Sequence, residues 1–569
     1  MYYDNLPGIN VTLKDGGLII PENGGSETML IVAPSLSKDA PEEPVLVRNS
    51  SELVEYGFGD FYVQGEANPI AIEWKAAVDG GCKIVYLAAL KEIDEETAEE
   101  LELNAIETFV ENGGEQDEAE AKYTGVLTGD NEMCRMRRKY LYFYDLMMNT
   151  LLDFSVDHVV LKGATIEDQV TDLDPAFFPE AANLEEYPNI GGIIVSSHII
   201  QSGLVTYPIV IEDGVNDVLA VEIGGESVEF KIPAKEYNGR NHTLSDLVAD
   251  IQKVIDEHSS NVNVVVREES SRIALYFEEE AKIAESTTAA ELNLKGKSVW
   301  KKTGLGLIQR GSFGQVIADY CSTKTLLKDA CVGYIGVKSP VDTKVSAIRK
   351  YVDELMQADT EMSPYLQVVG SEVGVTMPVT NSIQYINGAT HYAALVSTLN
   401  KESAPTNKQI KGVKSIRFDY SLRQLSRLTS KKIVTFRLKD SNLIITDGVT
   451  TAPSLNIEGR LRDSDYSRLS TLRITQLAIQ TVREAVDPFI GEANQMPQYN
   501  ALNTAIKSAL EKIREAGAIK GYKFSIANVS ARLDQATVIL EIVPAYELRR
   551  IEVQVSLVPS DDMLESLGL

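Results

Sequence analysis

The sequence predicts a multidomain chain that combines a layered α/β domain with an α+β domain near the C-terminus. Its 569 residues suffice for two to four domains, and 44% of them are apolar, as in globular proteins. Short apolar strands alternate with helical segments over most of the first 380 residues, which favours a layered α/β arrangement. From residue 381 on, long helices are mixed with alternating strands, which favours an α+β domain.

The α/β elements follow from local pattern and capping signals. Cys82 to Leu90 is a continuous apolar run of the kind that parallel sheets bury on both faces. The segment 68–78 is helical, and Gly80-Gly81 ends it. Residues 91–120 hold thirteen carboxylates and one basic residue, so we expect an exposed acidic helix and loop there. The remaining expected strands are 28–33, 156–161, 193–195, 331–337 and 365–370, and the remaining expected helices are 49–56, 140–154, 313–327 and 341–356.

The pattern changes between residues 205 and 300. A hairpin over 218–232 turns at Gly224-Gly225, an amphipathic helix starts at Thr243, and the strands 262–267 and 272–277 follow. This reads as a small ββαββ module inserted into an exposed loop of the α/β domain. The expected division is therefore an N-terminal strand arm (1–20), an α/β domain (21–204 and 301–380), the insertion (205–300), a C-terminal α+β domain (381–545), and a C-terminal strand arm with an acidic tail (546–569).

The last domain contains two further helices and two strands. The sequence predicts helices over 466–486 and 500–516, and Gly517 stops the second. Strands are expected at 522–528 and 537–543.

Charge and composition exclude several classes of function. The formal net charge is −29, so the chain repels nucleic acid and anionic membranes. The four cysteines form no CxxC pair and indicate buried thiols in a reducing compartment. We find no signal peptide and no apolar run of about 18 residues, and therefore expect synthesis and folding in a cytoplasm without membrane insertion.

The sequence offers no catalytic, metal-binding or cofactor-binding constellation. Its five histidines include no pair at i, i+4 and no HExxH. The glycine-rich loop 304–314 matches neither GxxxxGK[ST] nor GxGxxG and reads as a flexible link. Asp447 stands in T-D-G-V-T, where an Asp-Gly turn explains it better than acid catalysis does. We therefore predict no enzyme, no metal and no cofactor.

Both ends of the chain carry an isolated alternating strand. The apolar positions are Ile9, Val11 and Leu13 at the start, and Ile551, Val553, Val555 and Leu557 at the end. A terminal strand with open backbone groups pairs readily with another chain by β-augmentation. Two different surfaces would then join subunits head to tail, in rings or helical filaments. The alternative is that the two strands pair within their own chain.

A series of segments, most of them in the C-terminal third, follows the order seen in a known family. The segments are Pro7-Gly-Ile-Asn-Val11, Asn407, Ile433-Val-Thr-Phe-Arg437, Ile444 to Thr450, Asp465 to Ile474, Val482 to Glu492, Asn500 to Ile506 and Gly517 to Tyr522. In these segments the chain resembles the tail sheath proteins of contractile-tailed bacteriophages. The similarity spans residues 380–558 well and residues 1–90 and 313–375 loosely, and the insertion 205–300 does not take part in it.

The resemblance implies a structural role and a set of partners. Sheath subunits form hexameric rings that stack in a helical array around a tail tube, and both arms add strands to the sheets of neighbouring subunits. The resemblance implies that the C-terminal domain and the arms lie innermost, with the α/β domain and its insertion outside. The implied partners are further copies of this chain, the tail tube protein, and the baseplate and tail terminator proteins. The implied location is the virion tail, after assembly in the host bacterial cytoplasm, and contraction delivers the genome.

Two points stay open at this level. The helix 500–516 carries Lys507, Lys512 and Arg514, which we list as candidate tube-facing residues; ordinary solvated helix charges are the alternative. The rival functions are the sheath of a bacterial device, such as an R-type bacteriocin or secretion system, and an α/β enzyme with Asp447 or the loop 304–314 in its site.

Overall fold

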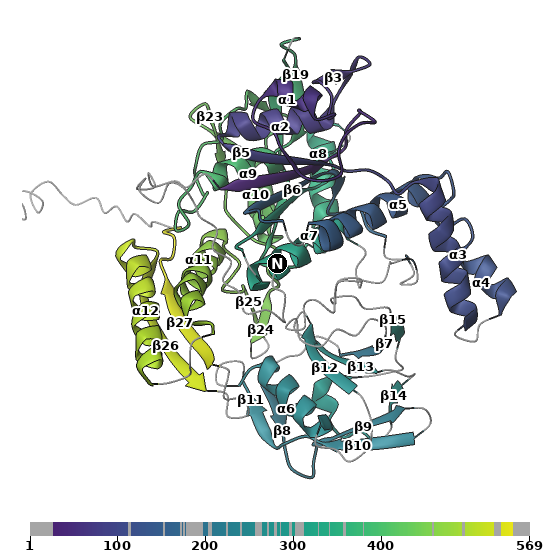
Figure 1. Cartoon of the computed structure of the whole chain (residues 1–569), viewed down its shortest axis with the longest axis vertical. Coiled ribbons are helices and arrows are strands. Elements are labelled where there is room, and N and C mark those ends of the chain that lie inside the picture. Colours follow the sequence, from purple (N-terminus) through teal and green to yellow (C-terminus); the bar gives the residue numbers. More distant parts are fainter. Residues whose placement is uncertain are drawn as a thin grey trace, which may run out of the picture.

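The computed structural model describes residues 27–549 apart from internal gaps, of which the longest cover 178–196 and 302–311. Figure 1 shows three parts: a central body built on a large sheet, an inserted domain at the bottom, and a C-terminal unit of two helices and two strands at the lower left. Among the residues described, no helix combines the length and the apolar character needed to cross a membrane.

A seven-stranded sheet forms the centre of the body. Its spatial order is β2-β5-β1-β6-β16-β17-β21, and every neighbouring pair is parallel except the edge pair β2–β5. The central position of β1 explains why every residue after Thr28 in this strand is apolar, since Met29 and Ile31 enter the core on one face of the sheet and Leu30 and Val32 enter the core on the other face. The strands are β1 (Thr28–Ala33), β2 (Val45–Leu46), β5 (Ile84–Ala89), β6 (His158–Thr165), β16 (Val332–Gly336), β17 (Leu366–Val369) and β21 (Ile433–Val434).

Helices cover both faces of this sheet, so the predicted layered α/β class is correct for the body. One face packs against α2 (Pro69–Gly80) and α9 (Ala389–Ser397). The other packs against α5 (Glu132–Asp145), α7 (Phe313–Leu327), α8 (Val345–Leu355) and α10 (Leu422–Ser430). Local signals set several ends: Asn49 caps the short α1 (Ser50–Glu55), and Gly81 ends α2 with a φ of 109°.

Smaller hairpins surround the body. They are β3 (Tyr62–Val63) with β4 (Glu66–Ala67), β18 (Glu372–Thr376) between β19 (Ile383–Asn387) and β20 (Ser415–Ile416), β22 (Phe436–Lys439) with β23 (Asn442–Ile445), and β24 (Leu455–Ile457) with β25 (Arg460–Arg462).

The acidic segment forms two helices that project from the body (Figure 1). They are α3 (Glu95–Glu111) and α4 (Gln116–Tyr123). Buried Glu102 fastens them to the next loop, because its carboxylate accepts hydrogen bonds from the backbone of Gly125, Leu127 and Thr128. The following helix α5 starts at Glu132 rather than at the predicted Tyr140, since Asn131 caps it by accepting from the Cys134 amide. A π-helical turn, Leu146–Thr150, continues α5.

The inserted domain has its own hydrophobic core and is larger than the sequence suggested. Its helix α6 (Leu244–Asp256) packs against two sheets, β12-β13-β7-β15 and β10-β9-β14, and the pair β8–β11 completes it. The domain begins with β7 and ends with β15, so it spans about residues 197–301 rather than 205–300. Its strands are β7 (Ser197–Gln201), β8 (Ile209–Ile211), β9 (Val218–Ile223), β10 (Glu226–Lys231), β11 (Lys235–Tyr237), β12 (Val264–Glu269), β13 (Arg272–Phe277), β14 (Ala281–Ile283) and β15 (Val299–Lys301).

The C-terminal unit is smaller than the predicted domain 381–545. It comprises α11 (Leu469–Val486), α12 (Met496–Glu515), β26 (Ile519–Asn528) and β27 (Ala536–Pro544). Residues 381–452 belong instead to the body, because β21 pairs with β17 and α9 is buried against the sheet. Helix α11 joins the two parts, since Leu469 and Leu472 enter the core of the body whereas Ile474 and Ala478 enter the core of the C-terminal unit.

Buried His391 on α9 makes the body sensitive to acid. Neither ring nitrogen has a hydrogen-bond partner among the described residues, and the side chain is fully buried. Burial, followed by the charges of Lys162 and Lys75, lowers the pKa of His391 from 6.5 to about 3. Below pH 6.5 His391 is therefore protonated in the unfolded chain but stays neutral in the folded chain, so the free energy of unfolding falls as the pH drops towards 3.

We expect this single group to remove on the order of 4 kcal/mol of stability between pH 6.5 and pH 3. Urea unfolding of wild type and His391→Leu, measured from pH 8 to pH 4, checks this. The variant should match the wild type near pH 8 and exceed it increasingly at lower pH. His242→Gln, at a histidine of the inserted domain, serves as the control for replacing a histidine outside the body. Parallel pH profiles for His391→Leu and wild type would contradict the assignment.

Candidate functional site

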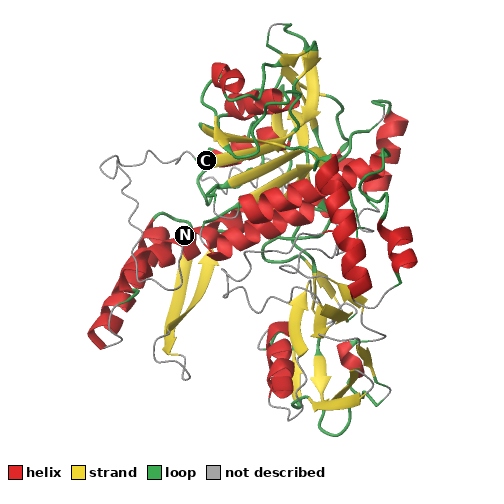
Figure 2. Cartoon of the chain, turned by 45° about the vertical axis from the view of Figure 1, so that its right-hand side comes forward, coloured by secondary structure: helices red, strands yellow, loops and turns green. Residues whose placement is uncertain are grey.

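The C-terminal unit presents a sheet of only two strands. β26 and β27 are antiparallel and long, with registers that run from Ile519–Pro544 to Asn528–Ala536. Within the described residues neither strand has a second neighbour, so each offers an open edge. Figure 2 shows the pair projecting beside the helices of the unit. An isolated two-stranded ribbon is marginal in water, and open edges are the usual place for another strand to add.

The apolar face of this ribbon is incompletely covered. Ile506, Leu510 and Ile513 of α12 are buried with Ile474 and Ala478 of α11 in a small core. Of the strand residues in this core, Ile519 at the start of β26 is buried, and the others are only partly buried: Tyr522, Phe524, Ile526, Val538, Leu540 and Ile542. On the opposite face Ile539 and Val543 are about half exposed, at 51% and 50%. Two helices thus lie over a sheet too narrow to fill the space beneath them.

The predicted strand positions at the two ends lie outside the described residues. These are Ile9, Val11, Leu13, Ile551, Val553, Val555 and Leu557. The structure does describe the residues at which the terminal segments meet the body, namely Glu27–Thr28 and Glu547–Arg549. We call these two short segments the N-terminal root and the C-terminal root.

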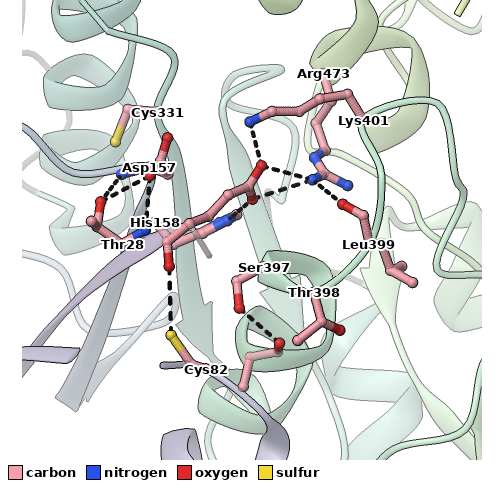
Figure 3. A network of polar contacts seen from close by, with 12 residues as sticks. Thr28, Cys82, Asp157, His158, Cys331, Ser397, Thr398, Leu399, Lys401 and Arg473 are labelled. Atoms are coloured by element: carbon pink, nitrogen blue, oxygen red, sulfur yellow. Dashed lines mark hydrogen bonds and ion pairs between the residues drawn. The ribbon is translucent and has the colours of Figure 1, made fainter. Parts of the chain in front are cut away.

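A cluster of basic side chains holds the N-terminal root (Figure 3). The Glu27 carboxylate contacts three basic side chains. One oxygen lies 2.5 Å from His158 Nε2, the two oxygens lie 3.1 and 3.2 Å from Arg473 Nη2, and one oxygen pairs with Lys401 Nζ. Burial alone would raise the pKa of Glu27, but His158, Arg473 and Lys401 together hold it well below its usual range. Thr28 adds two hydrogen bonds of 2.8 Å to Asp157, from its amide and its hydroxyl.

A second ionic cluster holds the C-terminal root. Asp447, 5% exposed, accepts from Arg468 Nη1 at 2.8 Å and from Arg549 Nη2 through the same oxygen. Glu547 lies beside both arginines, with Oε1 3.5 Å from Arg549 Nε and 4.0 Å from Arg468 Nε. Burial, and then the neighbouring Asp447, raise the pKa of Glu547 despite the two arginines. Asp447 therefore binds the C-terminal root to Arg468 through its ion pairs with both arginines. Its sequence context, an Asp-Gly turn, does not indicate this role.

The three candidate tube-facing residues lie on α12. Lys507, Lys512 and Arg514 are all exposed, on a helix whose other side contacts α11 and the sheet. Arg514 forms an ion pair with Glu511 one turn earlier, which partly balances its charge. Because both side chains are exposed to solvent, this ion pair is weak. The structure leaves the tube contact of these residues as a prediction.

The chain packs closely at the point where sheets of this topology ordinarily bind ligands. The parallel strands have the spatial order β5-β1-β6-β16-β17-β21, so the connection direction reverses between β1 and β6. Ligands of doubly wound sheets bind outside the carboxyl ends of the strands at this point. Here Pro34 follows β1 and lies against Gly163 of β6, where an added Cβ would come within 2.4 Å of the proline ring and 3.3 Å of Leu90.

The remaining candidates for chemistry do not assemble into a site. Within the described residues, no group of three or more His, Cys, Asp or Glu side chains is arranged to hold a metal ion. The loop 304–314 lies largely outside the described residues. Cys321 and Cys331 are neighbours, with sulfurs 3.3 Å apart, but both are fully buried, and burial raises the pKa of Cys321 well above its usual range.

Reasoning from the sequence missed both root clusters. Glu27 and Arg473 are separated by 446 positions, and nothing local to either residue indicates the contact. The only available signal was an arginine within the apolar run of a predicted helix, since a buried arginine needs a partner.

No protein-family model matches this chain, and no curated protein matches it. Some solved structures are similar to it. A chain of the anti-feeding prophage (AFP) helical sheath in the contracted state is 10% identical over 97% of this chain and 99% of that chain, with a TM-score of 0.44. A sheath tail protein from Listeria innocua is 8% identical over 92% of this chain and 93% of that chain, with a TM-score of 0.38.

A chain of the AFP baseplate is 15% identical over 43% of this chain, with a TM-score of 0.33, and the chain spans 66% of that protein's length. Identities of 8–15% and TM-scores below 0.5 are too low to transfer a fold or an activity.

Proposed function

We propose that this chain belongs to the tail sheath family and is the structural subunit of a contractile sheath. It polymerises as stacked hexameric rings around a tail tube, and contraction drives the tube through the host envelope to deliver the genome. The observation that carries the proposal is the pair β26–β27, whose edges are open and whose apolar face is only partly covered among the described residues. It is combined with the strand-like alternation in the sequences of both chain ends.

The pair β26–β27 is built to receive strands. Added strands would satisfy backbone groups at the open edges and would cover the partly buried apolar face beneath α11 and α12. The alternating segments 9–13 and 551–557 have the composition that such positions need. A donor segment and an acceptor sheet on different surfaces make a head-to-tail contact, which propagates into rings or helices.

The proposed partners are further copies of this chain, the tail tube protein, and the baseplate and tail terminator proteins. Lys507, Lys512 and Arg514 on α12 are the proposed tube-facing set, because exposed cations on an otherwise acidic chain can meet an acidic tube surface. The proposed location is a virion tail, after synthesis in a bacterial cytoplasm. The sheath of a bacterial injection device would use the same strand pairing, and the genes beside this one separate the two.

The proposal assigns no catalytic activity. The close contact between Pro34 and Gly163, where the connection direction reverses between β1 and β6, supports this, because a ligand bound between these two residues would have to separate them. Contraction would draw on the difference in stability between two packings of the same subunits, with each subunit moving as a rigid body on its connected arms.

Backbone hydrogen exchange tests the strand pairing directly. The full-length protein is concentrated, alone and with its tube protein, and tubes are identified by negative-stain electron microscopy. In tubes, the amides of 519–528 and 536–544 should exchange at least about tenfold more slowly than in the unassembled chain, because the added strands protect the open edges. The central strand β1 is the internal control and should exchange equally slowly in both states.

Tubes whose β26 and β27 amides exchange as fast as in the free chain would contradict the acceptor role. Failure to form tubes, even with tube protein present, would contradict the sheath assignment itself.

A further inference from the structure

The two roots are held by two arginines at the beginning of the same helix. Arg468 occupies the N-cap position of α11 and contacts the C-terminal root through Asp447. Arg473, within the second turn of α11, contacts the N-terminal root through Glu27. We infer that the start of α11 is a common anchor for both terminal arms, and that Arg468 and Arg473 are positioning residues that couple the two arms mechanically. This inference rests on the proposed function only where it assigns the arms to neighbouring subunits.

Arg473 is built into the interior rather than laid on the surface. It is 1% exposed, and its guanidinium donates to the carbonyl oxygens of Leu399 and Asn400 as well as to Glu27. Glu27 is the carboxylate partner of Arg473 among the described ion pairs, so separating the two would leave the arginine charge buried without a counter-charge. The N-terminal root is therefore fixed to α11 at a defined point, one residue before β1 enters the central sheet.

The C-terminal root is fixed by alternating charges. Arg468 and Arg549 share one oxygen of Asp447, and Glu547 lies against both guanidinium groups. The backbone strengthens this contact, because Arg468 forms a β-bridge with Val449 and Leu469 donates to the Gly448 carbonyl. The turn that carries Asp447 is thereby bound to the first residues of α11.

The geometry of α11 makes the two anchors one mechanical unit. Residues 468 and 473 are separated by about 7.5 Å of helix rise, so they cannot move independently without breaking helix hydrogen bonds. The helix also connects the core of the body with the core under β26 and β27. A pull on one arm is thus transmitted to the root of the other arm and to the acceptor sheet. An arrangement of this kind keeps a connected lattice in register while its subunits rotate.

The test measures whether release of one root loosens the other. Leu548 is 82% exposed at the C-terminal root, and the four native cysteines are buried, so Leu548→Cys takes a nitroxide label selectively. Mobility of this label is measured in the unassembled full-length chain for Arg468→Gln, Arg473→Gln and Arg473→Lys. Arg483→Gln, in the last turn of the same helix, is the matched control, because Arg483 donates to the Thr325 carbonyl.

We expect Arg468→Gln to shorten the rotational correlation time of the label at least about twofold, and Arg473→Gln to shorten it as well, although Arg473 contacts the other root. Arg473→Lys should restore most of the wild-type value, and Arg483→Gln should leave it unchanged. An unchanged label in Arg473→Gln would overturn the coupling, and an unchanged label in Arg468→Gln would overturn the anchor.

Two further controls keep the result interpretable. Thermal unfolding of each variant shows whether it is folded, and Glu27→Gln replaces Arg473→Gln if that variant is not. Tube formation by the unlabelled wild type is scored separately, so failure of the sheath assignment and failure of the anchor are distinguished.

Discussion

A chain that lacks residues 550–569 is expected to remain folded and soluble but to form no tubes. Within the described part of the chain, the buried core residues end at Ile519 and the partly buried ones at Ile542, so every described core keeps all of its residues in this truncation. Arg549 remains, and with it the ion pair to Asp447. Deletion of residues 1–20 should have the same effect, because it leaves Glu27 and its contacts with His158 and Arg473 in place.

The experiment combines size-exclusion chromatography, circular dichroism and electron microscopy. Both truncations should elute as monomers with the unfolding temperature of the unassembled wild type, and their tube yield should be negligible under conditions in which wild type assembles. Normal tubes from both truncations would reject strand exchange by the arms.

A matched pair of full-length variants separates strand pairing from mere chain length. Replacing Ile551, Val553, Val555 and Leu557 by serine removes the apolar face of the predicted strand and should abolish tubes. Replacing Glu552, Gln554 and Ser556 by alanine changes the opposite face and should leave assembly largely intact. Equal effects of the two variants would show that assembly does not depend on the alternation of apolar and polar residues in this segment.

Local pattern was sufficient to predict most elements of the body. The apolar runs of β1 and β5 indicate buried parallel strands. Gly81 ends α2 with a positive φ, which glycine adopts more easily than other residues do. The hairpin β9–β10 and helix α6 were also predictable, because a turn signal and a 3.6-residue period are local properties. The predicted α/β class is therefore confirmed for the body.

The domain boundary near residue 380 was misplaced for a tertiary reason. β21 has only two residues, too few to show a period, and its pairing with β17 depends on a contact across the sheet. Helix α9 is buried on all sides, so it lacks the amphipathic pattern that would mark it as covering a sheet. The site was only half predictable for the same reason. The alternating sequences of β26 and β27 predicted two strands. Their open edges could not be predicted, because an open edge depends on which other strands in the fold lie next to them.

The second large effect should come from breaking the buried ion pair between Glu73 and Lys162. Glu73 on α2 is 4% exposed, and its carboxylate accepts from the Thr390 hydroxyl on α9 and lies 3.0 Å from Lys162 Nζ on β6. Lys162 also donates to the Asn387 carbonyl at 2.8 Å. These contacts connect α2, α9 and the central sheet. Glu73→Ala leaves Lys162 charged and without its carboxylate, which typically costs about 3–5 kcal/mol.

Urea unfolding of the body, followed by tryptophan fluorescence, measures this cost, because Trp74 is buried beside the pair on α2. The same helix supplies the matched control. Lys75 and Asp79 form an ion pair with side chains 31% and 36% exposed, so Asp79→Asn should change stability by less than about 1 kcal/mol.

The double variant Glu73→Ala, Lys162→Met decides what the pair is for. If the loss in Glu73→Ala comes from the uncompensated charge, removing that charge should restore much of the stability, since apolar replacements of buried ion pairs are often neutral or better. If the double variant is no more stable than Glu73→Ala, the loss comes from the cavity and the missing hydrogen bond to Thr390 instead. The first outcome would mean that the pair sets the register of α2 and α9 on the sheet rather than supplying net stability. In the proposed sheath, such a pair would keep each subunit in one rigid shape while its contacts with neighbours are exchanged.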